Sequence, residues 1–245
     1  MDNFLNEDER IDDLEIKGLK LIQKKNDYCF SSDAVLLANF VKAKKGDVVV
    51  DFGTGSGIIS ILIAAKTNAS KVMGIELQKS MAQLAEKNVE FNNLTDKVTI
   101  YNDDIKNAEN ILGKESVSIV VCNPPYFKAT SGEVSSNEVK AISRTELKIT
   151  LEEIIQHAAG VLKYSGKLYM IHKSERLAEV LTTMSNNNLE PKKITFIYPK
   201  KSKQVDTFIV EAQKYGAPGV CISSFVVYEE NGEMTNEAKK LYNKI

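Results

Sequence analysis

The sequence predicts an α/β fold: a doubly wound, mainly parallel sheet of seven strands with helices on both faces. Apolar runs of strand length alternate with helical patterns from Asp47 onward, and alternating units of this kind form parallel sheets. A glycine-rich turn, Gly53 to Gly57, follows the first of these runs. The length of 245 residues suits one large α/β domain with small additions.

Each element follows from its local pattern. Residues 48–50 are three valines, which predict a strand buried on both faces. The spacing of apolar residues within 79–91 predicts a helix with one buried face. By the same reasoning we expect strands at 48–50, 71–76, 98–101, 117–122, 167–171, 194–198 and 207–212, and helices at 58–66, 79–91, 151–162 and 175–184.

Both ends of the chain are predicted to add to this core. Residues 1–46 form an N-terminal flap, with a small hairpin around Lys17-Gly18 and a helix that begins near Asp33. Residues 47–215 form the core, and residues 216–245 form a C-terminal hairpin and a short helix packed on it.

Composition narrows the functional classes. The chain is 43% hydrophobic and 27% charged, as in ordinary globular proteins, and its net charge of −1 lacks the basic excess of many nucleic-acid binders. No apolar run approaches the roughly 18 residues that span a bilayer, and no signal-peptide pattern is visible. The three cysteines are too scattered for a disulfide framework or a zinc site. We expect a cytoplasmic protein with no membrane and no metal partner; the oligomeric state is left open.

The turn after the first strand indicates a cofactor site. Its candidate contact residues are Asp51, Gly53, Thr54, Gly55 and Gly57. The glycines let the chain turn sharply and bring bare backbone to a ligand. The dinucleotide fingerprint needs its third glycine one position later, and the Walker pattern needs Gly-Lys-Ser/Thr, so neither fits. The acid that opens the turn would repel a pyrophosphate, whereas a sulfonium or ammonium cofactor tolerates it.

Acidic side chains also end the next two predicted strands. Glu76 comes about 20 residues after the glycines, where a carboxylate can accept hydrogen bonds from both ribose hydroxyls. Asp103 and Asp104 end the third strand, within reach of an adenine amino group, although either can instead cap the following turn. Acids after three successive strands favour a neutral or cationic nucleoside. S-adenosylmethionine is therefore the predicted cofactor.

The segment after the fourth strand, Asn123-Pro124-Pro125-Tyr126, predicts a clamp for a planar nitrogen. An exocyclic amine is a poor nucleophile because its lone pair is delocalised into the ring. Asn123 can accept one amine proton through its side-chain carbonyl and Pro124 another through its backbone carbonyl. Tyr126 offers a face on which a base can stack. Methyl transfer then needs alignment and polarisation rather than a strong base.

Together these motifs resemble those of class I S-adenosylmethionine-dependent methyltransferases that act on planar nitrogens, which have a Rossmann-like fold. A narrower resemblance, to the bacterial tRNA1(Val) (adenine-37-N6)-methyltransferase family, rests on the segments 30–38 and 141–146 and on the lysine-bearing segment before the last strands. This resemblance implies N6-methylation of adenine 37 in the anticodon loop of a valine tRNA, with tRNA as partner. Thr145 stands where the family often has histidine.

Candidate RNA contacts are Arg144, Lys200, Lys201 and Lys203, since an RNA needs local cations when the net charge is −1. Arg144 can equally form an ion pair with Glu146, and the lysines can be a solvated loop.

Three other functions fit parts of the pattern. A protein glutamine N5-methyltransferase presents the same chemical problem to the same clamp, but such enzymes carry a longer N-terminal helical domain than the 46 residues before the first strand here. A guanine N2-methyltransferase of rRNA more often has Phe where Tyr126 stands. A non-catalytic cofactor- or RNA-binding module would not need the clamp.

Overall fold

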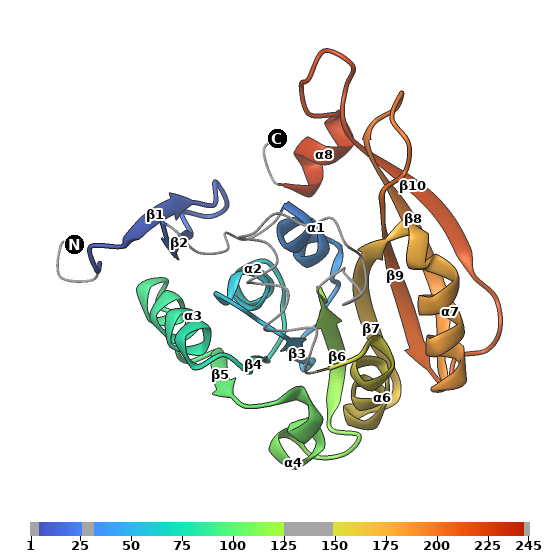
Figure 1. Cartoon of the computed structure of the whole chain (residues 1–245), viewed down its shortest axis with the longest axis horizontal. Coiled ribbons are helices and arrows are strands. Elements are labelled where there is room, and N and C mark those ends of the chain that lie inside the picture. Colours follow the sequence, from blue (N-terminus) through green and yellow to red (C-terminus); the bar gives the residue numbers. More distant parts are fainter. Residues whose placement is uncertain (1–4, 26–31, 125–148, 243–245) are drawn as a thin grey trace, which may run out of the picture.

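A computed structural model describes residues 5–25, 32–124 and 149–242 of the chain (Figure 1). Its main sheet has eight strands in the order β10-β8-β9-β7-β6-β3-β4-β5, and β1 and β2 form a separate two-stranded sheet. The strands are β1 (Glu9–Asp13), β2 (Lys20–Lys24), β3 (Val48–Phe52), β4 (Lys71–Glu76), β5 (Val98–Asn102), β6 (Val117–Cys122), β7 (Leu162–Lys173), β8 (Leu189–Lys200), β9 (Thr207–Lys214) and β10 (Cys221–Tyr228). The helices are α1 (Ser32–Phe40), α2 (Ile58–Lys66), α3 (Lys79–Phe91), α4 (Ala108–Leu112), α6 (Leu151–Val161), α7 (Leu177–Asn186) and α8 (Asn236–Leu241), with 3-10 turns η2 (Ile105–Asn107) and η3 (Ser174–Arg176).

Helices cover both faces of the sheet, as Figure 1 shows. Successive strand residues point to opposite faces, so Val49 belongs to a core that includes residues of α1, α2 and α8, while Val50 belongs to one that includes residues of α4, α6 and α7. Two apolar cores result, one on each face. The predicted doubly wound fold is confirmed, and each predicted strand and helix of the core is present within a few residues of its expected bounds.

The C-terminal segment differs from the prediction. β10 pairs in parallel with β8, so the sheet has eight strands rather than seven, and after β10 the chain turns back with an antiparallel bridge between Tyr228 and Met234. Packing explains the difference, because Phe225 of β10 is buried and lies edge-on to Phe40 of α1, with ring centroids 5.4 Å apart. The proposed boundaries after residues 46 and 215 stay a prediction.

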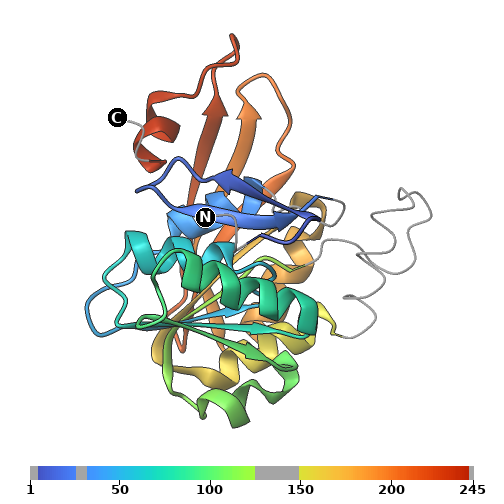
Figure 2. The same ribbon diagram turned by 90° about the vertical axis from the view of Figure 1, so that its left-hand side faces the viewer.

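The parallel strands end at one edge of the sheet. β3 lies between β4 and β6, and the crossovers run to opposite sides from this point, which is where ligands bind in open α/β sheets. The β1–β2 hairpin lies beside α3 (Figures 1 and 2). Within the described ranges, no helix has the length and apolar character needed to cross a membrane.

Candidate active site

Two predicted motifs meet where β3 and β6 end. These strands are neighbours in the sheet, and Phe52 lies opposite Cys122 in their register. The glycine turn that begins at Gly53 and the clamp that begins at Asn123 therefore leave adjacent strands at the same edge. Their proximity is the geometric condition for transfer between a cofactor and an acceptor.

The glycine turn is held open towards this edge. The amides of Gly53 and Thr54 both donate to the carbonyl of Ile75, at 2.9 and 3.1 Å. Gly53 has φ of 72°, and a Cβ atom there would meet no atom within 4 Å. Gly57 has another role, since its Cβ would lie 3.2 Å from that of Ala85 on α3. The turn thus leaves ligand space at its start and packs closely at its end.

Asp51 is fully buried at the end of β3. Its Oδ2 accepts hydrogen bonds from the hydroxyls of Thr54, at 2.6 Å, and Ser60, at 3.1 Å. Its Oδ1 has no hydrogen-bond partner among the described residues. Burial and, to a smaller extent, the charge of Glu76 raise the pKa of Asp51 to about 6, although these hydrogen bonds oppose the shift.

Glu76, at the end of β4, is 6% exposed. Its Oε2 accepts from the amide of Gly55 at 3.0 Å, and its Oε1 accepts from the amide of Gln78 at 2.8 Å. Burial raises its pKa, although these backbone hydrogen bonds oppose the shift. The carboxylate therefore lies directly against the glycine turn.

These features fit a cationic nucleoside cofactor. Asp51 and Glu76 are two desolvated carboxylates with raised pKa values, and the Oδ1 of Asp51 has no hydrogen-bond partner among the described residues. A nearby cation would favour both charged forms. The open backbone at Gly53 leaves space for the ligand beside them.

Asp103 and Asp104 differ from these two acids. The Oδ1 of Asp103 accepts from Asn107 Nδ2 at 2.8 Å and from the amide of Asp104 at 2.7 Å, and these bonds lower its pKa. Asp104 caps η2 by accepting from the amide of Lys106 at 3.0 Å. Both acids make local turn contacts and lie only partly buried. A role in binding adenine stays a prediction.

The clamp is described as far as Pro124. Asn123 is half-buried and Pro124 is buried, directly after β6. Tyr126 and Arg144 lie outside the described residues. Cys122 is buried and its pKa is raised by that burial, which makes it an inert core thiol rather than a nucleophile.

The predicted lysine contacts lie at the same edge, farther along the sheet. Lys200 ends β8, which runs parallel to β6 and three strands away from it, and Lys201 and Lys203 follow in an exposed turn. With strands about 4.8 Å apart, the clamp and this turn are on the order of 15 Å apart. Lys200 Nζ donates to the carbonyl of Glu230 at 3.1 Å.

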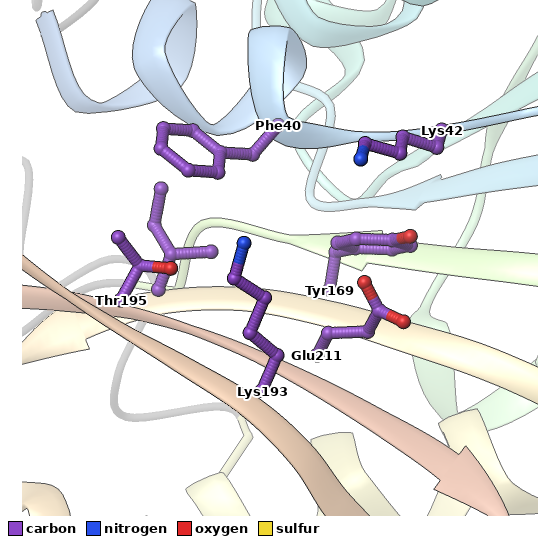
Figure 3. A pocket seen from close by; sticks show the side chains of 7 residues that line it. Phe40, Lys42, Tyr169, Lys193, Thr195 and Glu211 are labelled. Carbon is purple, nitrogen blue, oxygen red and sulfur yellow. The ribbon is translucent and has the colours of Figure 1, made fainter. Parts of the chain in front are cut away.

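A separate pocket has no residue of these motifs in its lining (Figure 3). Phe40, Lys42, Tyr169, Lys193, Thr195 and Glu211 line it. Tyr169, Glu211 and Lys193 lie side by side on β7, β9 and β8, and Phe40 at the end of α1 covers them, so the pocket lies between α1 and this part of the sheet. Among the described residues, no cluster of His, Cys, Asp and Glu could hold a metal ion.

Ser60 and Asn88 also belong to the site and were not predicted from the sequence. Ser60 supports Asp51, and its signal was a single hydroxyl within the otherwise apolar helix of residues 58–64. Asn88 is fully buried and donates to the carbonyl of Ser56 in the glycine turn at 3.0 Å. Its signal was an amide on the apolar face of a predicted helix.

Comparison with known families places these residues in context. The family model described as "Methyltransferase small domain" matches residues 30–192, which include the glycine turn, the acidic strand ends and the clamp. This match confirms the predicted methyltransferase resemblance.

Two curated relatives carry the same name. A tRNA1(Val) (adenine(37)-N6)-methyltransferase of Porphyromonas gingivalis is 26% identical over 164 residues, covering 66% of this chain and 64% of the relative. The chain thus spans just under two thirds of that relative's length. A protein of the same name from Shewanella sediminis is 26% identical over 176 residues, covering 71% of each chain.

Solved structures share the fold. A predicted O-methyltransferase from Agrobacterium tumefaciens has a TM-score of 0.70 at 21% identity, covering 86% of this chain and 95% of the other. TYW2 of M. jannaschii in complex with AdoMet has a TM-score of 0.58 at 17% identity, covering 85% and 87%. These similarities confirm the predicted Rossmann-like fold.

Proposed function

This chain belongs to the methyltransferase small domain family, and from that premise we propose that it is an S-adenosylmethionine-dependent methyltransferase acting on N6 of an adenine in RNA. The observation that carries the proposal is the adjacency of the glycine turn on β3 and Asn123-Pro124 on β6, next to two buried carboxylates. A cationic methyl donor and a planar amine acceptor match that combination.

The residues at the ends of β3, β4 and β5 would hold the cofactor. Glu76 would accept hydrogen bonds from the ribose hydroxyls, and the turn of Gly53 and Gly55 would contact the ligand through bare backbone. Asp51, which accepts a hydrogen bond from Thr54 of this turn, would stabilise the positive charge of the cofactor. Asp103 or Asp104 would accept a hydrogen bond from the adenine amino group. When bound, S-adenosylmethionine supplies an electrophilic methyl group on a sulfonium.

The clamp would prepare the acceptor. The side-chain carbonyl of Asn123 and the backbone carbonyl of Pro124 would accept the two amine protons, which favours a pyramidal nitrogen with its lone pair directed at the methyl group. Burial of Pro124 and half-burial of Asn123 keep competing water away from these acceptors. Tyr126 would stack on the base.

We propose adenine 37 of a valine tRNA as the acceptor and tRNA as the partner. Relatives named for that reaction support it. So do the exposed Lys201 and Lys203 at the same edge as the clamp, because an RNA loop next to the active site needs phosphate contacts. A base in a loop is already partly unstacked, so extruding it costs less than from a duplex.

The test is radiolabelled methyl transfer with valine tRNA transcripts. Nucleoside mass spectrometry should identify N6-methyladenosine with the unmodified transcript and none with a transcript carrying guanine at position 37. Total rRNA and release-factor protein serve as competing acceptors. Methylated glutamine or N2-methylguanosine as the main product would overturn the assignment.

A further inference from the structure

The N-terminal hairpin is attached to α3 by two asparagines spaced one helical turn apart. Asn92 brackets Lys20 of β2: its Oδ1 accepts from the Lys20 amide at 3.0 Å, and its Nδ2 donates to the Lys20 carbonyl at 2.7 Å. Asn88 brackets Ile22 in the same way, at 2.6 and 3.0 Å. Each side-chain amide pairs with β2 as a neighbouring strand would.

Only one of these asparagines also reaches the cofactor turn. The Nδ2 of Asn88 donates a second hydrogen bond to the carbonyl of Ser56, at 3.0 Å. A primary amide has two N–H donors, so Asn88 divides its two donors between Ile22 of the hairpin and Ser56 of the turn. Asn88 is fully buried, and no solvent is at hand to replace either bond.

We propose that Asn88 is a positioning residue that couples the N-terminal hairpin to the cofactor-binding turn. The inference rests on the proposed cofactor site. One planar amide fixes the carbonyls of Ile22 and Ser56 relative to each other, so the turn cannot shift without straining or breaking the bond to the hairpin. A ligand that orders the turn therefore orders the hairpin at Ile22, and by reciprocity the docked hairpin favours ligand binding.

The unmodified protein contains its own control. The Ile22 amide donates to Asn88 and the Lys20 amide to Asn92, and only Asn88 contacts the turn. Addition of S-adenosylhomocysteine should slow hydrogen exchange of the Ile22 amide by a factor several-fold larger than for the Lys20 amide. Equal factors, or slowing at neither amide when the ligand binds, would overturn the coupling.

Variants separate coupling from stability. In calorimetry, Asn88→Ala should weaken S-adenosylhomocysteine binding roughly three- to tenfold, the equivalent of one hydrogen bond, while Asn92→Ala should change it less than about twofold. Should Asn88→Ala fail to fold, the hydrogen-exchange comparison of Ile22 and Lys20 in the unmodified protein decides the coupling by itself. Equal affinities of wild type and the folded Asn88 variant would overturn the proposal.

Steady-state kinetics distinguish a positioning role of Asn88 from a role in stability alone, because only the positioning role changes KM for S-adenosylmethionine. The Asn88 variant should have a raised KM for S-adenosylmethionine and an unchanged kcat at saturation, because Asn123 is untouched. A lowered kcat with unchanged KM would indicate lost folded protein and overturn the coupling. Calorimetry needs no RNA, so a wrong acceptor leaves this test intact; a wild type that binds no S-adenosylhomocysteine would overturn both the cofactor site and this inference.

Discussion

The two halves of the strand-end edge have opposite chemistry. At β3 and β4 the edge carries the buried acids Asp51 and Glu76, both with raised pKa values. At β8 it carries Lys200 and the exposed Lys201 and Lys203, and the pKa of nearby Glu230 is lowered by hydrogen bonds from Ser202 and by the charges of Lys200 and Lys203. The first half is buried and acidic, and the second is largely exposed to solvent and carries three lysines close together in the sequence.

This difference shows how one edge can serve two ligands. A small cation gains most from buried carboxylates, where the effective dielectric is low. A polyanion is too large to be buried and gains from exposed cations that displace its counterions. Asn123, directly after β6, lies between the two halves. The edge is therefore suited to a cationic donor at one end and an anionic acceptor at the other.

The largest expected effect is the loss of turnover on changing Asn123, which lies between the acidic and basic halves of the edge. Asn123→Ala should lower kcat by roughly 10²–10³-fold, as for other groups that stabilise a transition state by a single hydrogen bond, because the acceptor amine loses one polarising carbonyl. Single-turnover methyl transfer to tRNA measures it. Binding of S-adenosylhomocysteine by calorimetry is the control and should stay near wild type. Full turnover in this variant would remove Asn123 from the chemistry.

The next effect tests the acidic half. Glu76→Ala should weaken S-adenosylhomocysteine binding by roughly 1–3 kcal/mol through lost charge-assisted hydrogen bonds. Since Glu76 also accepts from the Gly55 amide, Glu76→Gln, which retains an acceptor, should weaken binding less. Glu230→Ala, an acid of the basic half, is the matched control and should leave affinity unchanged. Equal effects of Glu76→Ala and Glu230→Ala would abolish the distinction between the halves.

The sequence predicted the acidic half more fully than the rest. Asp51, the glycines and Glu76 belong to a short strand–turn–helix–strand unit, in which local spacing determines which groups meet. The support from Ser60 and Asn88 could not be predicted in the same way, because it depends on the rotation of two helices against the turn. The pairing of β10 with β8 was missed because a parallel pair has no turn signal between its strands.

The third effect tests the basic half. Replacing Lys200, Lys201 and Lys203 by Gln should reduce the slope of log affinity for tRNA against log salt by about 2–3 units if each lysine contacts one phosphate. Fluorescence titrations across salt concentrations measure it. The control replaces the exposed Lys44, Lys45 and Lys71, which precede β3 or begin β4 at the opposite edge. A similar change in both triple variants would indicate a charge effect without a local RNA surface.

The smallest effect concerns proton exchange at Asp51. Its pKa of about 6 means that at pH 6 about half of the free molecules carry a proton there. A bound cation favours the charged form, so S-adenosylmethionine should release up to about half a proton at pH 6 and almost none at pH 8. Calorimetry in buffers of different ionisation enthalpy measures this number, and Asp51→Asn should abolish the release.

Stability gives an independent check on the same carboxyl group. Because the pKa of Asp51 is raised in the folded state, its contribution to stability is fully present below its ordinary pKa of 3.8 and is lost as pH rises through about 6. The free energy of unfolding of Asp51→Asn should therefore exceed that of wild type by on the order of 1–3 kcal/mol at pH 8 and by little at pH 4. If the difference in free energy of unfolding between Asp51→Asn and wild type were the same at pH 4 and pH 8, and Asp51→Asn released as many protons as wild type, the titrating group would not be Asp51. The acidic half would then have no buried carboxylate that responds to a bound cation.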